Sequence, residues 1–220
     1  VRYLSDFQAL EGHLAAREPV WLRQVRQQAW TCFTELGFPT ARRGNERWKY
    51  TNVSPIASTT FQYPFDPSLD RVHAADIHSL SPWNDSWINL VFVNGRYSEV
   101  LSTPPPESNG VRVISLTDAI LADQGLVRPY LAQYATVDKD AFTAFNTAFL
   151  HDGAFVHVEK GQSLPTPLHL LFVTTDRAEP IVSHPRTLVV ASPQSKLTVI
   201  ESYVSLSHGR YFTNAVTEIV

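Results

Sequence analysis

Hydrophobic residues near the start of the chain recur at steps of three and four, the spacing of one face of an α-helix. A short first stripe consists of Phe7, Leu10 and Leu14. A longer second stripe consists of Leu22, Val25, Ala29, Cys32 and Leu36. Pro19 suits the first turn of the second helix, and Gly37 with Pro39 suits its end. The pattern therefore predicts two amphipathic helices before residue 40.

Residues 51–86 show no such period. Ser, Thr and Asp are frequent, and prolines interrupt the segment at Pro55, Pro64, Pro67 and Pro82. This composition fits either a long ordered loop wrapped over a domain or a partly mobile linker. The sequence leaves both interpretations open.

Strand-forming residues dominate the next segment. Asn94-Gly95 separates Trp87–Val93 from Arg96–Leu101, which predicts a hairpin because both turn residues need positive φ. Val111–Ile114 fits one more strand, and Ser115 with Asp118 resembles a capping box that opens a helix. A further helix is expected to carry Phe142, Phe145 and Phe149 on one face and to stop near Asp152-Gly153.

From Ala154 onward the chain carries short β-type runs separated by polar, Pro or Gly turns. The predicted strands are Phe155–Val158, Leu168–Thr174, Thr187–Ala191, Leu197–Val204 and Ala215–Val220. Such spacing suits a sandwich, a barrel or a β-solenoid, and the absence of a hexapeptide repeat argues against a left-handed β-helix. The last run leaves an open strand edge. We therefore expect the natural protein to continue, or this edge to pair with a partner.

Composition narrows the class of protein. The 220 residues carry a net charge of -3, which argues against a general electrostatic grip on nucleic acid or on an anionic membrane. A single cysteine excludes an internal disulfide framework and favours a reducing compartment. Val1–Leu14 has no apolar run typical of a signal peptide, and no stretch of eighteen apolar residues predicts a membrane helix. We expect a cytoplasmic protein, or an organellar one that has lost a transit peptide.

Two residue types could carry chemistry. Cys32 could be a nucleophile or sulfur carrier, but it lies on the apolar stripe near a helix C-terminus, where a buried cysteine packs as a small hydrophobe. The histidines at the start of the β region are His151, His157, His169 and His184. Three of them could converge on zinc or iron, although no pair has the usual ligand spacing. The preferred interpretation of both residue types is structural.

Other catalytic signatures are missing from the sequence. The acids beyond residue 154 form no Asp-Asp or Asp-x-Asp cluster, which argues against carbohydrate cleavage by paired carboxylates. They are scattered, and most are expected at turns or strand ends: Glu159, Asp176, Glu179, Glu201 and Glu218. No Gly-rich phosphate loop and no GxSxG elbow occur, so any ATP hydrolysis would belong to another chain.

The segment from Gly37 to Thr51 is the most distinctive one, because it is rich in guanidinium, aromatic and amide groups. Arg42–Thr51 could be a recognition patch or a phosphate contact. The favoured alternative is an internal brace in which Trp48 and Tyr50 pack on the preceding helix and Glu46 pairs with an arginine.

This segment, read with three others, resembles the SufD family of iron–sulfur cluster assembly proteins. The first motif is Gly37-Phe38-Pro39-Thr40, then a basic pair, then Glu46-Arg47-Trp48-Lys49-Tyr50-Thr51. The others are Leu90–Tyr97, Ala144–Phe149 running into Asp152-Gly153, and Leu197–Ser205 followed by Tyr211–Asn214. Together they span nearly all of the chain in family order. The Trp48–Thr51 motif points to SufD, since the related SufB subunit has a different N-terminal segment.

The resemblance implies a fold and a role. It implies an α+β N-terminal region over residues 1–152, followed over 153–220 by the first turns of an all-β, right-handed parallel β-helix. It implies a non-enzymatic scaffold that pairs with a SufB-like subunit and binds a SufC-like ATPase, with a homodimer as an alternative state and no nucleic-acid or membrane partner. Iron or an iron–sulfur cluster is expected only at the SufB–SufD interface. Location in the cytoplasm, or in the plastid stroma of a plant or alga, follows.

No residue of this chain matches a family position with an assigned catalytic, cofactor-binding or metal-ligating role, so none is assigned here. The rival hypothesis is a β-helix enzyme acting on polysaccharide, with its catalytic carboxylates beyond residue 220. An acidic cluster beyond that residue and a secretion signal would distinguish the rival.

Overall fold

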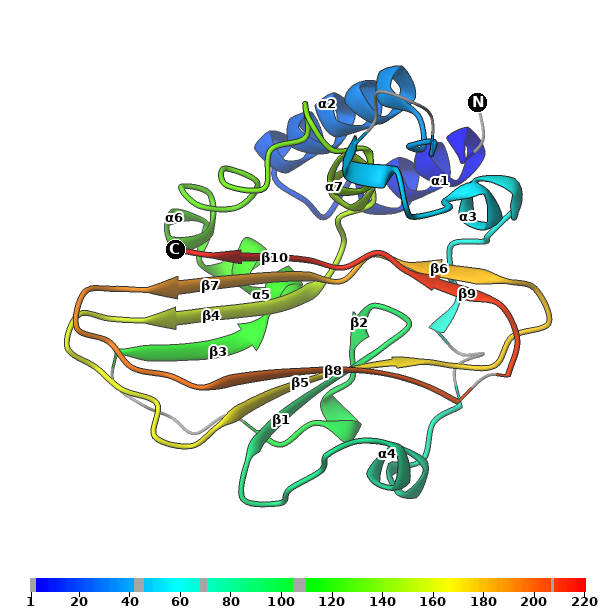
Figure 1. The fold of residues 1–220 in the computed structure, drawn as a ribbon. Helices are drawn as coiled ribbons and strands as arrows, with labels where there is room; N and C mark the ends of the chain where they lie inside the picture. Colours follow the sequence, from blue (N-terminus) through cyan, green and yellow to red (C-terminus); the bar gives the residue numbers. More distant parts are fainter. Residues whose placement is uncertain (1–2, 42–45, 68–70, 105–109, 207) are drawn as a thin grey trace.

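A computed structural model describes residues 3–41, 46–67, 71–104, 110–206 and 208–220 (Figure 1). Its α-helices are α1 Leu4–Leu14, α2 Val20–Leu36, α3 Ser54–Ser58, α4 Ala74–Leu80, α5 Leu116–Ala122, α6 Gln124–Val127 and α7 Ala141–Ala148. Its strands are β1 Ile88–Val93, β2 Arg96–Tyr97, β3 Val111–Ser115, β4 Gly153–Val158, β5 Leu168–Thr174, β6 Ile181–Ser183, β7 Arg186–Ala191, β8 Val199–Ser205, β9 Tyr211–Thr213 and β10 Val216–Ile219. The predicted mixed α+β class is confirmed.

The strands form three sheets, with orders β2-β1-β5-β8, β10-β7-β4-β3 and β6-β9. The β1–β2 and β3–β4 pairs are antiparallel, whereas the other pairs are parallel. From β4 onward each strand pairs with the strand three places later: β4 with β7, β5 with β8, β6 with β9 and β7 with β10. The described strands close no barrel, so the barrel alternative is not realised.

An apolar interior lies between the two four-stranded sheets. Leu90 and Phe92 of β1 stand level with Leu170 and Phe172 of β5, and they face Val156 and other residues of the opposite sheet. Every residue of β1 and β5 is buried. Such continuous burial is typical of parallel strands that are covered on both faces.

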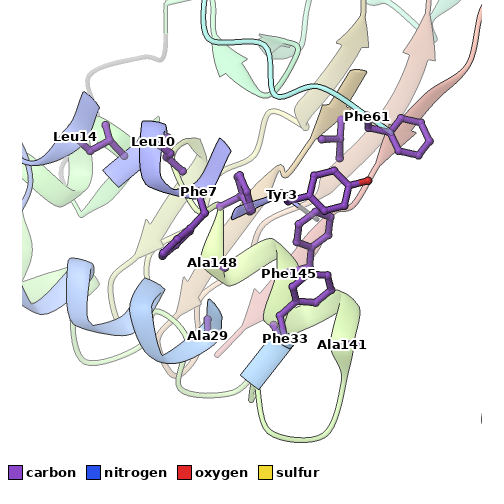
Figure 2. Close-up of a cluster of buried hydrophobic side chains, with 13 residues drawn as sticks. Tyr3, Phe7, Leu10, Leu14, Ala29, Phe33, Phe61, Ala141, Phe145 and Ala148 are labelled. Carbon is purple, nitrogen blue, oxygen red and sulfur yellow. The ribbon is translucent and has the colours of Figure 1, made fainter. Parts of the chain in front are cut away.

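Helices α1, α2 and α7 form a layer beyond the sheet that contains β4 and β7 (Figure 1). Figure 2 shows Phe7 of α1, Phe33 of α2 and Phe145 of α7 in one buried cluster, in which the Phe33 and Phe145 rings stack at 4.5 Å. The bounds of α1 and α2, including the end at Gly37, agree with the prediction.

The predicted stripe of α2 needs a correction. The buried residues of this helix are Leu22, Arg26, Ala29 and Phe33. Val25 and Cys32 are half-buried, while Leu36 is 45% exposed. The buried face of the helix therefore differs from the expected one. It includes Arg26, which lies among the acidic partners Glu11 and Glu18, a pairing that hydrophobic spacing cannot reveal.

The described part of residues 51–86 packs over the domain, as the first of the two interpretations expects. It contains α3 and α4, neither of which was predicted. Phe61 is buried in the helical cluster, and Tyr63 and Phe65 pack against it. Ile77 of α4 is buried against the outer face of β1 and β5. The segment therefore covers both the helical layer and one sheet.

Two turns depend on their glycines. Asn94 and Gly95 have φ values of 48° and 83°, which confirms the predicted hairpin. Its second strand is only Arg96–Tyr97, followed by a 3₁₀ turn at Glu99–Leu101, so the predicted extent to Leu101 was wrong. Gly153 has φ 155°, and a Cβ there would lie 1.8 Å from the Arg186 carbonyl oxygen. Only glycine permits this approach of β4 to β7.

The region after residue 153 contains two strands that the sequence did not predict, β6 and β9. Each has three residues, too few to show a period of two. They nevertheless pair in parallel and complete the three-strand repeat. The predicted boundary at residue 152 stays a prediction, and β1–β5 and β3–β4 pairing join the two regions through shared sheets.

Candidate interaction surface

Among the strands that the structure describes, β8, β9 and β10 each pair with a single neighbour in their sheets. We call the surface that they form, made up of residues 199–205, 211–213 and 216–219, the open edge. It exposes several large apolar side chains: Tyr203 is 45% exposed, Tyr211 43% and Ile219 72%. Along β8 and β10, backbone N–H groups of alternate residues point away from the one paired neighbour. The open edge thus offers both apolar side chains and unpaired backbone groups.

Rows of interior side chains run onto the open edge. The rings of Phe92, Phe172 and Tyr203 stack in succession, at 4.9 Å and 5.0 Å between centroids. In the next row, Leu90 and Leu170 are followed by Glu201. The aromatic row therefore continues onto the edge, whereas the leucine row ends there in the exposed carboxylate of Glu201.

Glu201 bridges the two sheets. Its carboxylate accepts hydrogen bonds from Thr217 of β10, at 3.0 Å and 3.3 Å, and from the Tyr203 hydroxyl at 3.3 Å. Burial, followed by the Glu201 charge, raises the pKa of Tyr203, so the phenol keeps its proton and donates it. These exposed contacts link β8 to β10.

A buried ion pair joins β10 to β7. Arg186 Nη2 of β7 lies 2.6 Å from Glu218 Oε2, and both side chains are almost fully buried. Arg186 Nη1 also donates to Asn146 and Thr147 of α7. Backbone N–H groups of Ala132, Tyr134 and Ala135 donate to Glu218. This network joins the helical layer to the last strand.

The Glu218 carboxylate in this network stays ionised at neutral pH. Burial opposes ionisation of Glu218, but the Arg186 guanidinium and the three backbone donors outweigh it and lower the pKa of the carboxyl. The expectation that most acids beyond residue 154 lie at turns or strand ends holds for Glu159, Asp176 and Glu179, whereas Glu201 and Glu218 lie within β8 and β10.

Asp152 joins three elements just before β4. Its carboxylate accepts N–H donors from Tyr97 at 2.8 Å, Thr117 at 3.2 Å and Gly153 at 2.8 Å. Burial raises the pKa of Asp152, and these donors oppose the rise. The residue connects the hairpin, the start of α5 and the first strand of the repeat.

His169 belongs to a polar ladder across β1, β5 and β8. Its Nδ1 lies 2.9 Å from Asn89 Oδ1, and its Nε2 lies 2.9 Å from Ser202 Oγ. The Asn89 amide nitrogen donates to the carbonyls of Asn84 and Trp87, so Oδ1 must accept from Nδ1–H. Burial lowers the pKa of His169, and the neutral ring accepts the Ser202 proton at Nε2. The ladder holds three strands in register.

The other histidines occupy separate environments. His151 Nδ1 lies 3.1 Å from the Tyr63 hydroxyl, and the His157 ring stacks with Phe155 in β4. His184 stacks on Phe149 and accepts from the Asn214 amide at 3.3 Å. Burial lowers the pKa of His184 to about 3 and that of His151 to about 4. Among the described residues, no group of three or more His, Cys, Asp or Glu side chains is placed to hold a metal ion.

The remaining predicted candidates have mixed outcomes. Cys32 is half-buried against the helical cluster, as the structural interpretation expected. Trp48 packs on Phe142 of α7 at 5.2 Å between ring centroids, whereas Tyr50 is 90% exposed, so the predicted brace is wrong for Tyr50. Among the described residues, Glu46 pairs with Lys49, at 3.5 Å. Residues 42–45 lie outside the described part of the chain.

The family model of the SufBD protein N-terminal region matches residues 1–170 of this chain. The chain belongs to the SufBD family. The resemblance read from the four motifs is confirmed.

Curated relatives cover almost the whole chain. An iron-sulfur cluster assembly SufBD family protein of Synechocystis is 31% identical over 98% of this chain and 48% of its own length. SufD of Bacillus subtilis is 24% identical over 99% of this chain and 48% of its own, and SufD of Escherichia coli is 28% identical over 92% and 44%. The chain spans about half the length of these relatives. Within the described ranges, no helix is long and apolar enough to cross a membrane.

Proposed function

We propose that this chain is part of a scaffold subunit that assembles iron–sulfur clusters together with a SufB-like subunit and a SufC-like ATPase. Membership of the SufBD family is the observation that carries this proposal, because the relatives are named as iron–sulfur cluster assembly proteins. The same membership favours cluster assembly over the polysaccharide-cleaving alternative. In this role the iron–sulfur cluster is cargo, and ATP hydrolysis belongs to the partner.

We further propose that residues 153–220 are the first turns of a right-handed parallel β-helix. The three-strand repeat supports it, since each strand from β4 to β7 lies beside the strand three places later. Parallel strands joined by crossovers are right-handed in nearly all proteins. In this arrangement the open edge receives the next turn or a partner strand, which would cover Tyr203 and Ile219.

The scaffold role implies that this region supplies no catalytic residue or cofactor ligand of its own. Individual side-chain partners support a structural role for the histidines: Asn89 and Ser202 for His169, Tyr63 for His151 and Asn214 for His184. Iron or the cluster would be held at the interface with the SufB-like subunit. We propose a cytoplasmic location, or the plastid stroma in a plant or alga; one Arabidopsis relative is named as chloroplastic.

Co-expression followed by native mass spectrometry tests the proposal. The complete polypeptide carrying this sequence is produced with SufB-like and SufC-like partners and analysed without denaturation. A complex that contains all three chains is the expected result. A monomer or homodimer that ignores both partners would contradict the scaffold role.

A further inference from the structure

A pocket of about 190 Å³ lies between α1, α2 and α5, away from the open edge. Its apolar walls are Leu14, Leu22, Ile120 and Leu121. Its polar lining is His13, Arg17, Glu18, Arg26, Thr117 and His151. This volume is below that of typical drug-sized sites, so a smaller molecule with an apolar body and one polar end fits it.

The charges that line the pocket leave a positive excess. The Glu18 side chain is only 6% exposed, and its Oε1 is paired with Arg26 in a short contact and with Arg23 at 3.5 Å. Its Oε2 is buried without a hydrogen-bond partner among the described residues. Arg26 is fully buried and also contacts Glu11, at 3.3 Å. Arg17 is exposed at the pocket, and its guanidinium makes no hydrogen bond or ion pair with the residues that the structure describes. The polar end of a ligand would therefore be an anion.

The tautomer of His151 adds a hydrogen-bond donor. Burial raises the pKa of Tyr63 to about 12, so its hydroxyl is protonated, and the nearby Arg96 cation attracts the lone pairs of the oxygen. The phenol hydrogen then points to His151 Nδ1, 3.1 Å away. Neutral His151 consequently carries its own proton on Nε2. Because His151 lines the pocket, Nε2–H is the ring donor left for a ligand.

We propose that this pocket binds a small monocarboxylate with an apolar body, held by Arg17 and His151 Nε2–H and enclosed by Leu22 and Ile120. A planar carboxylate accepts two donors at once and matches a guanidinium fork. The apolar body removes the surrounding leucine and isoleucine surface from water. This site is separate from the open edge, so its test does not depend on the proposed scaffold role.

Benzoate titration of the ¹⁵N-histidine-labelled chain tests the site, with neutral benzamide as the matched ligand. We expect a saturable shift of the His151 Nε2 signal with benzoate and binding at least about tenfold weaker with benzamide, since hydrogen bonds to charged groups dominate. Absence of a saturable His151 shift, or equal binding of the two ligands, would overturn the proposal.

Three variants locate the binding. Arg17→Gln should weaken benzoate binding about tenfold, whereas Arg128→Gln, at an exposed position on another surface, should leave it unchanged. Leu121→Trp should abolish binding, because Leu121 is 53% exposed and a larger side chain there fills the pocket without disturbing the core. Urea unfolding verifies that each variant folds. Folded Arg17→Gln or Leu121→Trp chains that bind benzoate normally would refute this site.

Discussion

Strands β5 and β8 are neighbours with the same direction and residue-by-residue register, yet their environments differ completely. Every residue of β5 is buried, whereas none of β8 is. β5 has a strand on each side, while β8 has one on a single side. The contrast therefore reflects position in the sheet as well as residue type.

The residues of β8 suit a covered strand. Val199 and Tyr203 continue the interior rows, and Ile200 and Val204 continue the opposite face. A parallel strand with apolar residues on both faces is normally covered on both. Glu201 and Ser205 are the polar residues among the interior positions of β8. The apolar residues of β8 are the physical basis for the proposal that the open edge becomes covered.

The largest effect is expected from the buried acid of β10 compared with the exposed acid of β8. Glu218→Ala should lower the free energy of unfolding by about 3–5 kcal/mol, because it leaves Arg186 buried without its charge partner. Glu201→Ala should change it by about 0.5 kcal/mol or less, since that carboxylate is exposed. Urea denaturation measures both. Equal losses would remove the distinction between the two positions.

Substitutions in the apolar rows should have the next largest effect on the free energy of unfolding. Leu170→Ala in β5 should cost about 3 kcal/mol, because a fully buried leucine leaves a cavity. Val199→Ala, in β8 and level with buried Leu168, should cost about 1 kcal/mol or less, because it is half-buried. Thermal and urea unfolding report the difference. A loss at Val199 as large as that at Leu170 would show that β8 is already covered.

The buried His184, between β6 and β7 and packed on Phe145 and Phe149, predicts a pH effect. The pKa of His184 in the folded chain is about 3, below its ordinary 6.5. The stabilising effect of the neutral ring on the free energy of unfolding is therefore fully present above pH 6.5 and is lost as the pH falls towards 3. Because of this single group, the free energy of unfolding should be about 2 kcal/mol lower at pH 5 than at pH 7. His184→Phe should reduce the loss between pH 7 and pH 5, as measured by urea unfolding. The control His208→Gln, in an exposed turn near the open edge, should keep it; an unchanged pH dependence in His184→Phe would contradict the assignment.

The smallest effect concerns the ladder that reaches β8. Ser202→Ala should cost about 1 kcal/mol, because His169 Nε2 loses its donor. Tyr203→Phe, which removes only an exposed hydroxyl contact to Glu201, should cost less than about 0.5 kcal/mol. Urea unfolding of the two variants gives the ranking. The reverse order would show that Ser202 does not complete the ladder.

Much of the fold could be predicted from local pattern. Steps of three and four placed α1 and α2, Asn94-Gly95 placed the hairpin, and Ser115 placed the start of α5 through its cap to Asp118. These signals are local in sequence, so one chain is enough to read them. Strands β6 and β9 were missed because three residues carry no readable period.

The candidate site was less predictable, because its partners are distant in sequence. Arg186 and Glu218 are 32 positions apart, and Asn89 and His169 are 80 apart. No spacing rule joins such residues before the sheet register is known. The buried polar asparagines gave one available signal: Asn146 and Asn214 lie within the family motifs, and the structure connects them by a 2.7 Å hydrogen bond.

Hydrogen exchange at the open edge tests the central claim most directly. Backbone amides of Glu201, Tyr203 and Thr217 point away from their single neighbouring strands, so in the 220-residue chain they should exchange rapidly, whereas β5 amides exchange slowly. In the complete protein, assembled with its SufB-like and SufC-like partners, the account predicts that β8, β9 and β10 become as protected as β5. Unchanged rapid exchange in these three strands, with new protection confined to α1, α2 and α7, would contradict it.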